Sequence, residues 1–446
     1  MKKDNKMGTM PINRLLITMS LPMIISMLVQ ALYNIVDSYY VAKISEEAFT
    51  AVSLAFPLQN LMIAFGAGTS VGMNSLLSRC LGEKNQDHVN KTATNSAFIF
   101  AVTALVFALI GFTCSRLFFA VQIQDPTILK YGTIYTTIVL GFGFGLFGQF
   151  YFEKMLQATG RTLLSMITQI IGAVINIILD PIFIFGYLGI PALGIAGAGI
   201  ATIIGQIIAM ICAMLMNIYL NHDVHLNFKG FKPDFEIIKK IYAVGIPSIV
   251  MSSIGSVMTF GMNKILITFS NTATAVFGAY FKLQSFIFMP VIGLNNGMIP
   301  IIAFNYGAKN KQRIYDTLKY ARLYASGLMF VGLLIFLIFP RQLLSLFEAS
   351  EQMLAIGVPA LRIIATHFIF AGYCIATSSL FQAVGKGTYS LILSLIRQLF
   401  VLLPAAYLLS LFGNINLIWL SFPIAEISSI ITAIILCKRV YKYIEA

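Results

Sequence analysis

Twelve long runs of apolar residues, separated by short polar or Gly/Pro-containing segments, dominate this sequence. A helix needs about 20 residues to cross the roughly 30 Å hydrocarbon core of a membrane, and long runs without alternating polarity are typical of membrane-spanning helices. The sequence therefore predicts an all-α polytopic membrane protein with twelve transmembrane helices. The runs cover residues 12–41, 48–78, 92–119, 131–157, 161–187, 192–220, 238–269, 272–304, 315–340, 353–381, 387–411 and 414–437.

The composition excludes an ordinary soluble protein. Hydrophobic residues make up 58% of the 446 residues and charged residues only 11%, whereas soluble domains carry about 25% charged residues. A net charge of +13 would suit nucleic-acid binding only on a water-soluble basic domain, and none is indicated. The five cysteines are widely spaced and include no CxxC pair, so they indicate neither a disulfide framework nor a metal site.

The distribution of Lys and Arg indicates how the helices are oriented. If the N-terminus is cytoplasmic, most basic residues fall in cytoplasmic segments, whereas only Lys43, Arg116, Lys130 and Arg341 fall in outer ones. Cytoplasmic loops of membrane proteins are enriched in Lys and Arg. Both termini are therefore predicted to be cytoplasmic, and the first span is predicted to be a retained helix, since no small-residue cleavage site follows it.

The two halves of the chain repeat one another. An offset of 225 residues superposes Pro22 on Pro247 and Gly72 on Gly297. Each copy contains six spans, so both copies enter the membrane from the same side and form parallel repeats. The predicted domains are an N-terminal six-helix lobe (1–220), a cytoplasmic linker (221–240) and a C-terminal six-helix lobe (241–446).

Acidic residues inside the predicted spans are the main candidates for function, because a charged group in hydrocarbon is costly. In the second half, Met262 and Ala405 occupy the positions equivalent to Asp37 and Asp180, so an acidic site of this kind belongs to the first half alone. The acidic residues within spans are Asp37, Glu153, Asp180 and Glu426.

Four polar residues share the outer half of the first lobe. Asp37 and Asp180 each lie about two turns before the outer end of their span, and Asn176 lies one turn from Asp180 on the same helix face. Thr202 lies two to three turns into the sixth span. Two carboxylates with an amide and a hydroxyl suit a hard cation such as Na⁺ or a shared proton, so we predict the coupling-ion site here. In the structural alternative, both acids are merely satisfied by neighbouring polar side chains.

Other polar residues carry weaker signals. Glu153, followed by Lys154, suits either a functional role or an ion pair at a helix end, and Glu426 is equally open. His367 favours a hydrogen-bonded structural imidazole. His222 and His225 lie in a polar loop and do not indicate a metal site. The accessory candidates for the ion site are Asn34, Glu153, Gln206 and Glu426.

The glycine-rich run at 141–148, GFGFGLFG, follows no strand and is embedded in an apolar span. It therefore predicts close packing inside a continuous helix and not a dinucleotide-binding loop. Walker, GxSxG and HExxH motifs are absent from the sequence, and no nucleophile and base pattern indicates an enzyme.

The run NIILDPIFIFGYLGIPALGIAGAGIATIIGQ (176–206), with VDSYYVAKI following LPMII and twelve spans in two halves, resembles the bacterial branch of the multidrug and toxic compound extrusion family. The resemblance covers essentially the whole chain. It implies a coupling-ion site built from a first-span Asp, a fifth-span Asn-x-x-x-Asp and a sixth-span Thr, and a bend at a first-span proline, matched by Pro22. Spans 238–269 and 353–381 contain no Asp or Glu, unlike members with a sodium site in the second lobe. The matching ion-site residues are Asp37, Asn176, Asp180 and Thr202.

Residues and resemblance together predict a secondary antiporter of the bacterial inner membrane. It would export lipophilic, cationic drugs or toxic metabolites in exchange for H⁺ or Na⁺ by alternating access, as a monomer. Small molecules and membrane lipid are the expected partners, with no nucleic acid and no cofactor or metal beyond the coupling ion. The alternative is a lipid-linked oligosaccharide flippase of the same superfamily, which would show about fourteen spans and a basic cavity. The intramembrane cations that keep this alternative open are Lys264, Lys282, Arg362 and Arg397.

Overall fold

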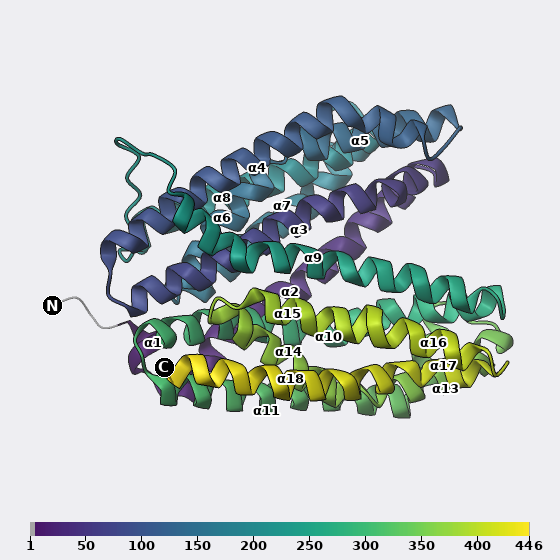
Figure 1. Cartoon of the computed structure of the whole chain (residues 1–446). Coiled ribbons are helices and arrows are strands. Elements are labelled where there is room, and N and C mark those ends of the chain that lie inside the picture. The colour runs from purple at the N-terminus through teal and green to yellow at the C-terminus, as the bar shows by residue number, and fades with distance from the viewer. Residues whose placement is uncertain (1–4, 446) are drawn as a thin grey trace. The chain divides into compact units, whose positions relative to one another are not determined.

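The computed structural model describes residues 5–445, which form helices joined by turns and by one longer segment, 221–234, with no strand in that range (Figure 1). The predicted all-α fold is confirmed. The helices are α1 (Lys6–Thr9), α2 (Ile12–Ala42), α3 (Glu46–Gly82), α4 (Gln86–Ala120), α5 (Pro126–Gly141), α6 (Phe144–Ala158), α7 (Thr162–Phe185), α8 (Ile195–Leu220), α9 (Phe235–Leu266), α10 (Asn271–Gly307), α11 (Lys311–Ile338), α12 (Pro340–Ser345), α13 (Glu351–Ala365), α14 (Phe368–Ala383), α15 (Gly387–Leu395), the π-helix η1 (Ile396–Leu402), α16 (Leu403–Ser410), α17 (Ile415–Trp419) and α18 (Ser421–Glu445).

The number of membrane spans agrees with the sequence. Between residues 5 and 445, 11 helical stretches are long and apolar enough to cross a membrane. The pair α13 and α14, bent by 48° at its break, brings the number to 12 when it is counted as one span. The chain is therefore a multi-pass membrane protein.

The glycine-rich run departs from its prediction in one respect. The helix is not continuous, because α5 ends at Gly141 and α6 begins at Phe144, with a turn between them. Close packing is nevertheless observed: a Cβ atom at Gly145 would lie 2.9 Å from a side-chain carbon of Ile207 on α8, and one at Gly148 would overlap Met210. These glycines allow α6 to approach α8 closely, while the closely spaced Gly141 and Gly143 weaken the helix at the turn.

The chain divides into two compact units, which we call the N-unit (25–245) and the C-unit (residues up to 24, together with 246 onward). Two helices belong to both units. The division falls between Ile24 and Ile25 in α2, and between Gly245 and Ile246 in α9. The predicted lobes are bounded at loops, whereas these compact units divide inside helices.

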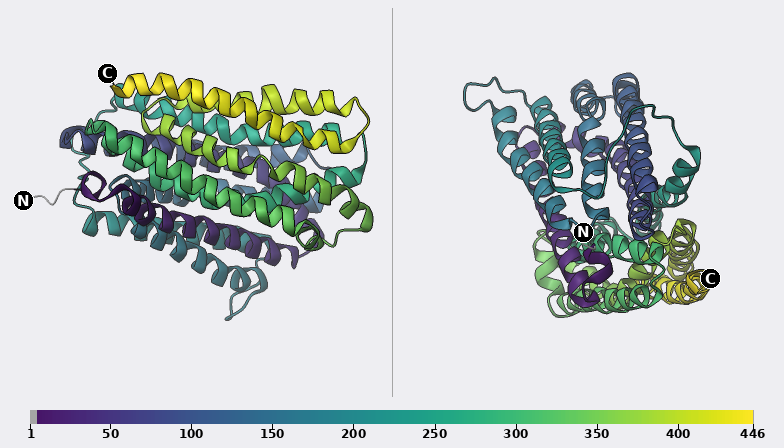
Figure 2. Two further views of the ribbon diagram at one scale, coloured as in Figure 1. Left: turned by 90° about the horizontal axis from the view of Figure 1, so that it is seen from below. Right: turned by 90° about the vertical axis from the view of Figure 1, so that its left-hand side faces the viewer.

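In the N-unit, the turns at one end of the bundle are tied to the segment that follows α8. Arg161, after α6, forms a 2.6 Å ion pair with Asp223. Gln86, at the start of α4, donates to the Asp223 carbonyl over 2.8 Å. The opposite end carries the α2–α3, α4–α5 and α7–α8 turns (Figure 2).

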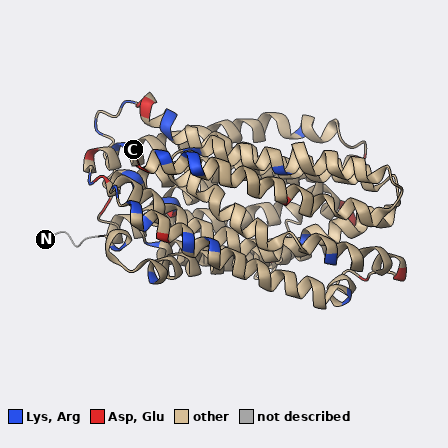
Figure 3. Cartoon of the chain, turned by 60° about the horizontal axis from the view of Figure 1, so that its bottom comes forward, with Lys and Arg blue, Asp and Glu red and all other residues tan. Residues whose placement is uncertain are grey.

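In the C-unit, the first described residues and the end of α18 meet the same helix terminus. Lys311, at the start of α11, donates to the Glu445 carbonyl over 2.6 Å, and Arg313 donates to the carbonyls of Met7 and Met10 over 2.9 and 2.8 Å. Lys and Arg gather at the end of the helices where the chain ends lie (Figure 3). Both ends of the described chain therefore lie at one end of the C-unit.

Candidate functional site

Two carboxyl groups meet inside the N-unit. Asp37 on α2 and Asp180 on α7 lie within hydrogen-bond reach of each other. Asp180 is fully buried, whereas Asp37 is half-buried. Both residues lie five positions before the end of their helix, which places them toward the end of the bundle that carries the α2–α3 and α7–α8 turns. The structure thus brings together the two acids that the sequence singles out.

Asn176 links Asp180 to the neighbouring helix α8. In the amide orientation that satisfies both neighbours, its nitrogen donates to Asp180 Oδ2 over 3.1 Å and its oxygen accepts from the Thr202 backbone N–H over 3.0 Å. The Thr202 hydroxyl donates to the Ala198 carbonyl over 3.0 Å, which leaves its oxygen able to accept. All four predicted site residues therefore share one cluster.

Small residues allow α7 and α8 to approach at this place. A Cβ atom at Gly205 would lie 2.8 Å from the Gly172 carbonyl oxygen and 3.1 Å from Asn176 Cβ. Larger side chains would push the helices apart and separate Asn176 from Thr202. Gly172 and Gly205 therefore allow the Asn176 amide to reach the backbone of Thr202.

The carboxyl groups are not fully satisfied by protein donors. One oxygen of each acid, Oδ1 of Asp37 and Oδ1 of Asp180, is buried without a hydrogen-bond partner, and so is Oε1 of Gln206. Buried polar atoms in proteins are nearly always bonded, so such atoms need an explanation. Carboxylate oxygens that lack protein donors suit a proton or a hard cation. In residues 5–445, no group of three His, Cys, Asp or Glu side chains could hold a metal ion.

Two tyrosines complete the cluster, and the sequence reasoning missed both. The Tyr33 hydroxyl hydrogen-bonds with Thr202, and both carboxyl groups act on it electrostatically. Tyr135 on α5 hydrogen-bonds with Gln59 on α3 and also lies within electrostatic range of Asp37 and Asp180. The sequence could have indicated Tyr33, because it lies one turn before Asp37 on the same helix face. Tyr135 had none, since its neighbours come from other helices.

The accessory candidates are scattered. Gln206 lies one turn beyond Thr202 on α8 and is half-buried, whereas Asn34 is exposed. Glu153 on α6 is buried, with 3% of its surface exposed, and so is Lys154 with 8% exposed. Glu153 accepts hydrogen bonds from Gln149, Thr168 and Gln169 over 2.9, 3.2 and 2.7 Å. Glu153 is therefore a separate buried carboxyl group with three neutral donors.

Glu426 lies in the C-unit, not in the cluster around Asp37. Its Oε2 atom is 3.8 Å from Arg397, which the π-helix η1 carries, and its Oε1 atom is buried without a hydrogen-bond partner. His367 stands at the break between α13 and α14, where its Nδ1 atom bonds to the Ile364 carbonyl. The ring of His367 packs against aromatic neighbours, which agrees with a structural imidazole; these rings are Phe288, Phe368 and Phe422.

Comparison with known proteins agrees with this architecture. The MatE family profile matches residues 22–182 and again 247–408, and the two matches start 225 residues apart, as the sequence repeat does. The chain is 30% identical to the multidrug export protein MepA of Staphylococcus haemolyticus, over 91% of this chain and 89% of that protein. It is 26% identical to MepA of Staphylococcus aureus strain MRSA252, over 93% and 91% of the two chains.

A solved structure has the same fold. It is described as the outward-facing conformation of a multidrug resistance MATE family transporter of the MOP superfamily. It superposes with a TM-score of 0.92 at 24% identity and covers 100% of this chain and 99% of that chain. With both halves matched by one family profile, and with relatives named as exporters and not as enzymes, this chain is a member of the MatE family, the multidrug and toxic compound extrusion transporters.

Proposed function

We propose that this protein is a secondary antiporter that exports lipophilic, cationic compounds from a bacterial cell in exchange for H⁺ or Na⁺. The observation that carries the proposal is the contact between Asp37 and Asp180, each with one buried carboxyl oxygen that no protein donor reaches. Its relatives are named multidrug export proteins, which supports drug export as the direction of transport.

The ion site supplies a simple form of exchange. When Asp37 and Asp180 are both ionised, their mutual repulsion favours uptake of a cation or a proton between them. An ion that enters neutralises the pair and removes the negative charge that would hold a cationic substrate. Because ion and substrate favour opposite states of the same carboxyl groups, entry of one promotes release of the other.

Alternating access then needs two bodies that move relative to one another. We propose that the six-helix lobes 1–220 and 241–446, joined by the linker 221–240, are these bodies, with both termini in the cytoplasm. The repeat in the family profile supports two equivalent halves. Pro22 interrupts the backbone hydrogen bonds of α2, and it is the proposed hinge that links ion occupancy to the shape of the first lobe.

The lipid-linked oligosaccharide alternative has less support. Arg397 is paired with Glu426, Arg362 donates to the Leu337 carbonyl over 3.2 Å, and Lys264 lies over the ring of Phe260. Cations with local partners of this kind are poorly placed to hold a lipid phosphate.

The test is efflux of a fluorescent cation such as ethidium from sealed vesicles that contain the purified protein. A pH gradient and a Na⁺ gradient are imposed separately, with protein-free vesicles as the control. Efflux driven by one gradient alone identifies the coupling ion. If neither gradient drives efflux while the protein binds ethidium, secondary antiport is excluded.

A further inference from the structure

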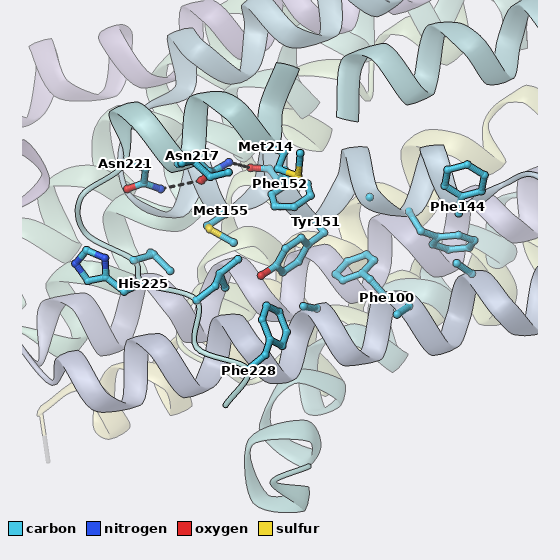
Figure 4. Close-up of a pocket in the computed structure, with 18 of the residues that line it drawn as sticks. Phe100, Phe144, Tyr151, Phe152, Met155, Met214, Asn217, Asn221, His225 and Phe228 are labelled. Atoms are coloured by element: carbon cyan, nitrogen blue, oxygen red, sulfur yellow. Dashed lines mark hydrogen bonds between the residues drawn. The ribbon is translucent and has the colours of Figure 1, made fainter. Parts of the chain in front are cut away.

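A cavity of about 640 Å³ lies in the N-unit, away from the acidic cluster (Figure 4). Its walls come from α4, α6 and α8, and the segment that follows α8 covers one side. On α8 the cavity begins at Met214, twelve residues after Thr202, which corresponds to about 18 Å along a helix. The cavity is therefore a separate feature from the ion site.

The lining is mainly apolar and includes several aromatic rings. In Figure 4 the rings of Phe100, Tyr151, Phe152 and Phe228 surround one space, and Met155 and Met214 supply thioethers. Aromatic faces bind flat apolar molecules, and thioether side chains adapt to different shapes. A cavity of about 300 to 1,000 Å³ with such walls is typical of a site for one drug-sized molecule.

The polar groups gather at one end. Asn217 donates to the Phe152 carbonyl over 2.9 Å and accepts from Asn221 over the same distance, so the protein already uses these amide groups. The imidazoles of His222 and His225 also line this end, and each ring carries one donor and one acceptor when neutral. A ligand with a polar group at one tip would place that group here.

The charge of the lining limits the ligand further. Among the described residues that surround the cavity, none is Asp, Glu, Lys or Arg. Two acids directly follow lining residues along the chain: Glu153 accepts hydrogen bonds from Gln149, Thr168 and Gln169, and Asp223 is held by Arg161 in the 2.6 Å ion pair. A permanent cation or anion would lose its hydration here without gaining an opposite charge, which is unfavourable.

From these observations we infer that the cavity is a binding site for uncharged aromatic lipophiles that carry one hydrogen-bonding group. A bound molecule contacts α4, α6 and α8 together with residues 224–228, the start of the segment between the two halves. The site goes beyond the proposed ion coupling and does not depend on it, because binding is measured without any gradient.

The first test is photolabelling of the purified full-length protein in detergent with benzophenone, an uncharged aromatic ketone that inserts efficiently into methionine C–H bonds. Mass spectrometry should locate the label at Met155 and Met214, and excess N-phenyl-1-naphthylamine should suppress it. Excess tetraphenylphosphonium, a permanent cation, should suppress it much less. Labelling confined to other regions of the protein would overturn the proposal.

The second test fills the cavity. Ala101→Phe and Ala104→Phe on α4 place a ring in it, whereas Val102→Phe and Val106→Phe place the same ring on exposed positions of the same helix that do not line the cavity. Saturable binding of N-phenyl-1-naphthylamine, measured by equilibrium dialysis, should weaken at least about tenfold in the first pair and less than about twofold in the second. Equal effects in both pairs would refute the site.

Folding and coupling are controlled separately. Each variant must elute as a single peak in size-exclusion chromatography, and the photolabelling result stands even if a filled variant misfolds. Asp37→Asn should bind N-phenyl-1-naphthylamine with unchanged affinity. If its binding is lost, the cavity is not independent of the ion site and the inference fails, whereas unchanged binding with abolished transport separates the two proposals.

Discussion

Pro22 and Pro247 occupy equivalent places in the two helices that belong to both units. Pro22 precedes the division in α2 at Ile24, and Pro247 directly follows the division in α9 at Ile246. A proline inside a helix removes one backbone hydrogen bond and clashes with the preceding turn. Both helices are therefore weakened close to the point where they pass from one unit to the other.

The first prediction concerns these two prolines. If Pro22 couples ion occupancy to a bend, Pro22→Ala should reduce gradient-driven efflux several-fold with little loss of substrate binding. Without the proline, α2 would no longer bend when the charge of Asp37 changes. Pro247→Ala should reduce transport less, because Met262, and not an acid, occupies the position in the second half that is equivalent to Asp37. Equal transport losses in vesicles would mean that both prolines only shape the helices.

The second prediction concerns Asp37 and Asp180. Asn at either position keeps the size of the side chain but removes the titratable group, so gradient-driven efflux should fall to the level of protein-free vesicles. Membrane expression should be unchanged. Asp125→Asn, in an exposed turn, is the control. Full transport by Asp37→Asn would end the proposal that this pair binds the coupling ion.

The third prediction concerns the Tyr33 hydroxyl. Tyr33→Phe keeps the ring but removes the hydrogen bond with Thr202, so Thr202 is positioned less well beside Asn176. A lost hydrogen bond of about 1 kcal/mol corresponds to a roughly fivefold shift in the ion concentration that gives half-maximal efflux. Tyr39→Phe, on the exposed side of the same helix, should show no shift. An unchanged ion dependence of Tyr33→Phe would exclude the tyrosine from the site.

The fourth prediction concerns the ion pair in the C-unit. Glu426→Ala leaves Arg397 without its acidic partner inside the membrane, which should cost about 3 to 5 kcal/mol of stability. The double variant Glu426→Ala, Arg397→Met should recover much of that loss, because no unpaired charge remains. Thermal unfolding of the purified protein in detergent measures both. Additive losses in the double variant would show that the pair does not stabilise the fold.

The fifth prediction concerns orientation. In a variant without native cysteines, Cys at exposed Asn271 or Asn414 should react with a membrane-impermeant maleimide added to intact cells, whereas Cys at exposed Lys311 should not. Permeabilised cells should label all three positions. Reaction of the Lys311 position in intact cells would reverse the orientation that the basic residues predict.

The sequence by itself determined the fold class, the twelve spans and the main acids. Lipid admits only helices and closed barrels, because every backbone polar group must be bonded within the protein, and long apolar runs without alternating polarity select helices. Intramembrane acids are rare enough that Asp37 and Asp180 are recognisable from the sequence. The spacing of Asn176 and Asp180 is set by the helix itself, so the relation between them is local.

Only the tertiary structure decided which groups from different helices meet. Two of the three donors to Glu153 come from α7, and the partner of Glu426 comes from a π-helix. Tyr135 on α5 contacts Gln59 on α3. The cavity beside α4, α6 and α8 also depends on how these helices pack. Contacts of this kind depend on crossing angles and side-chain volumes between segments far apart in the chain, which apolar periodicity does not specify.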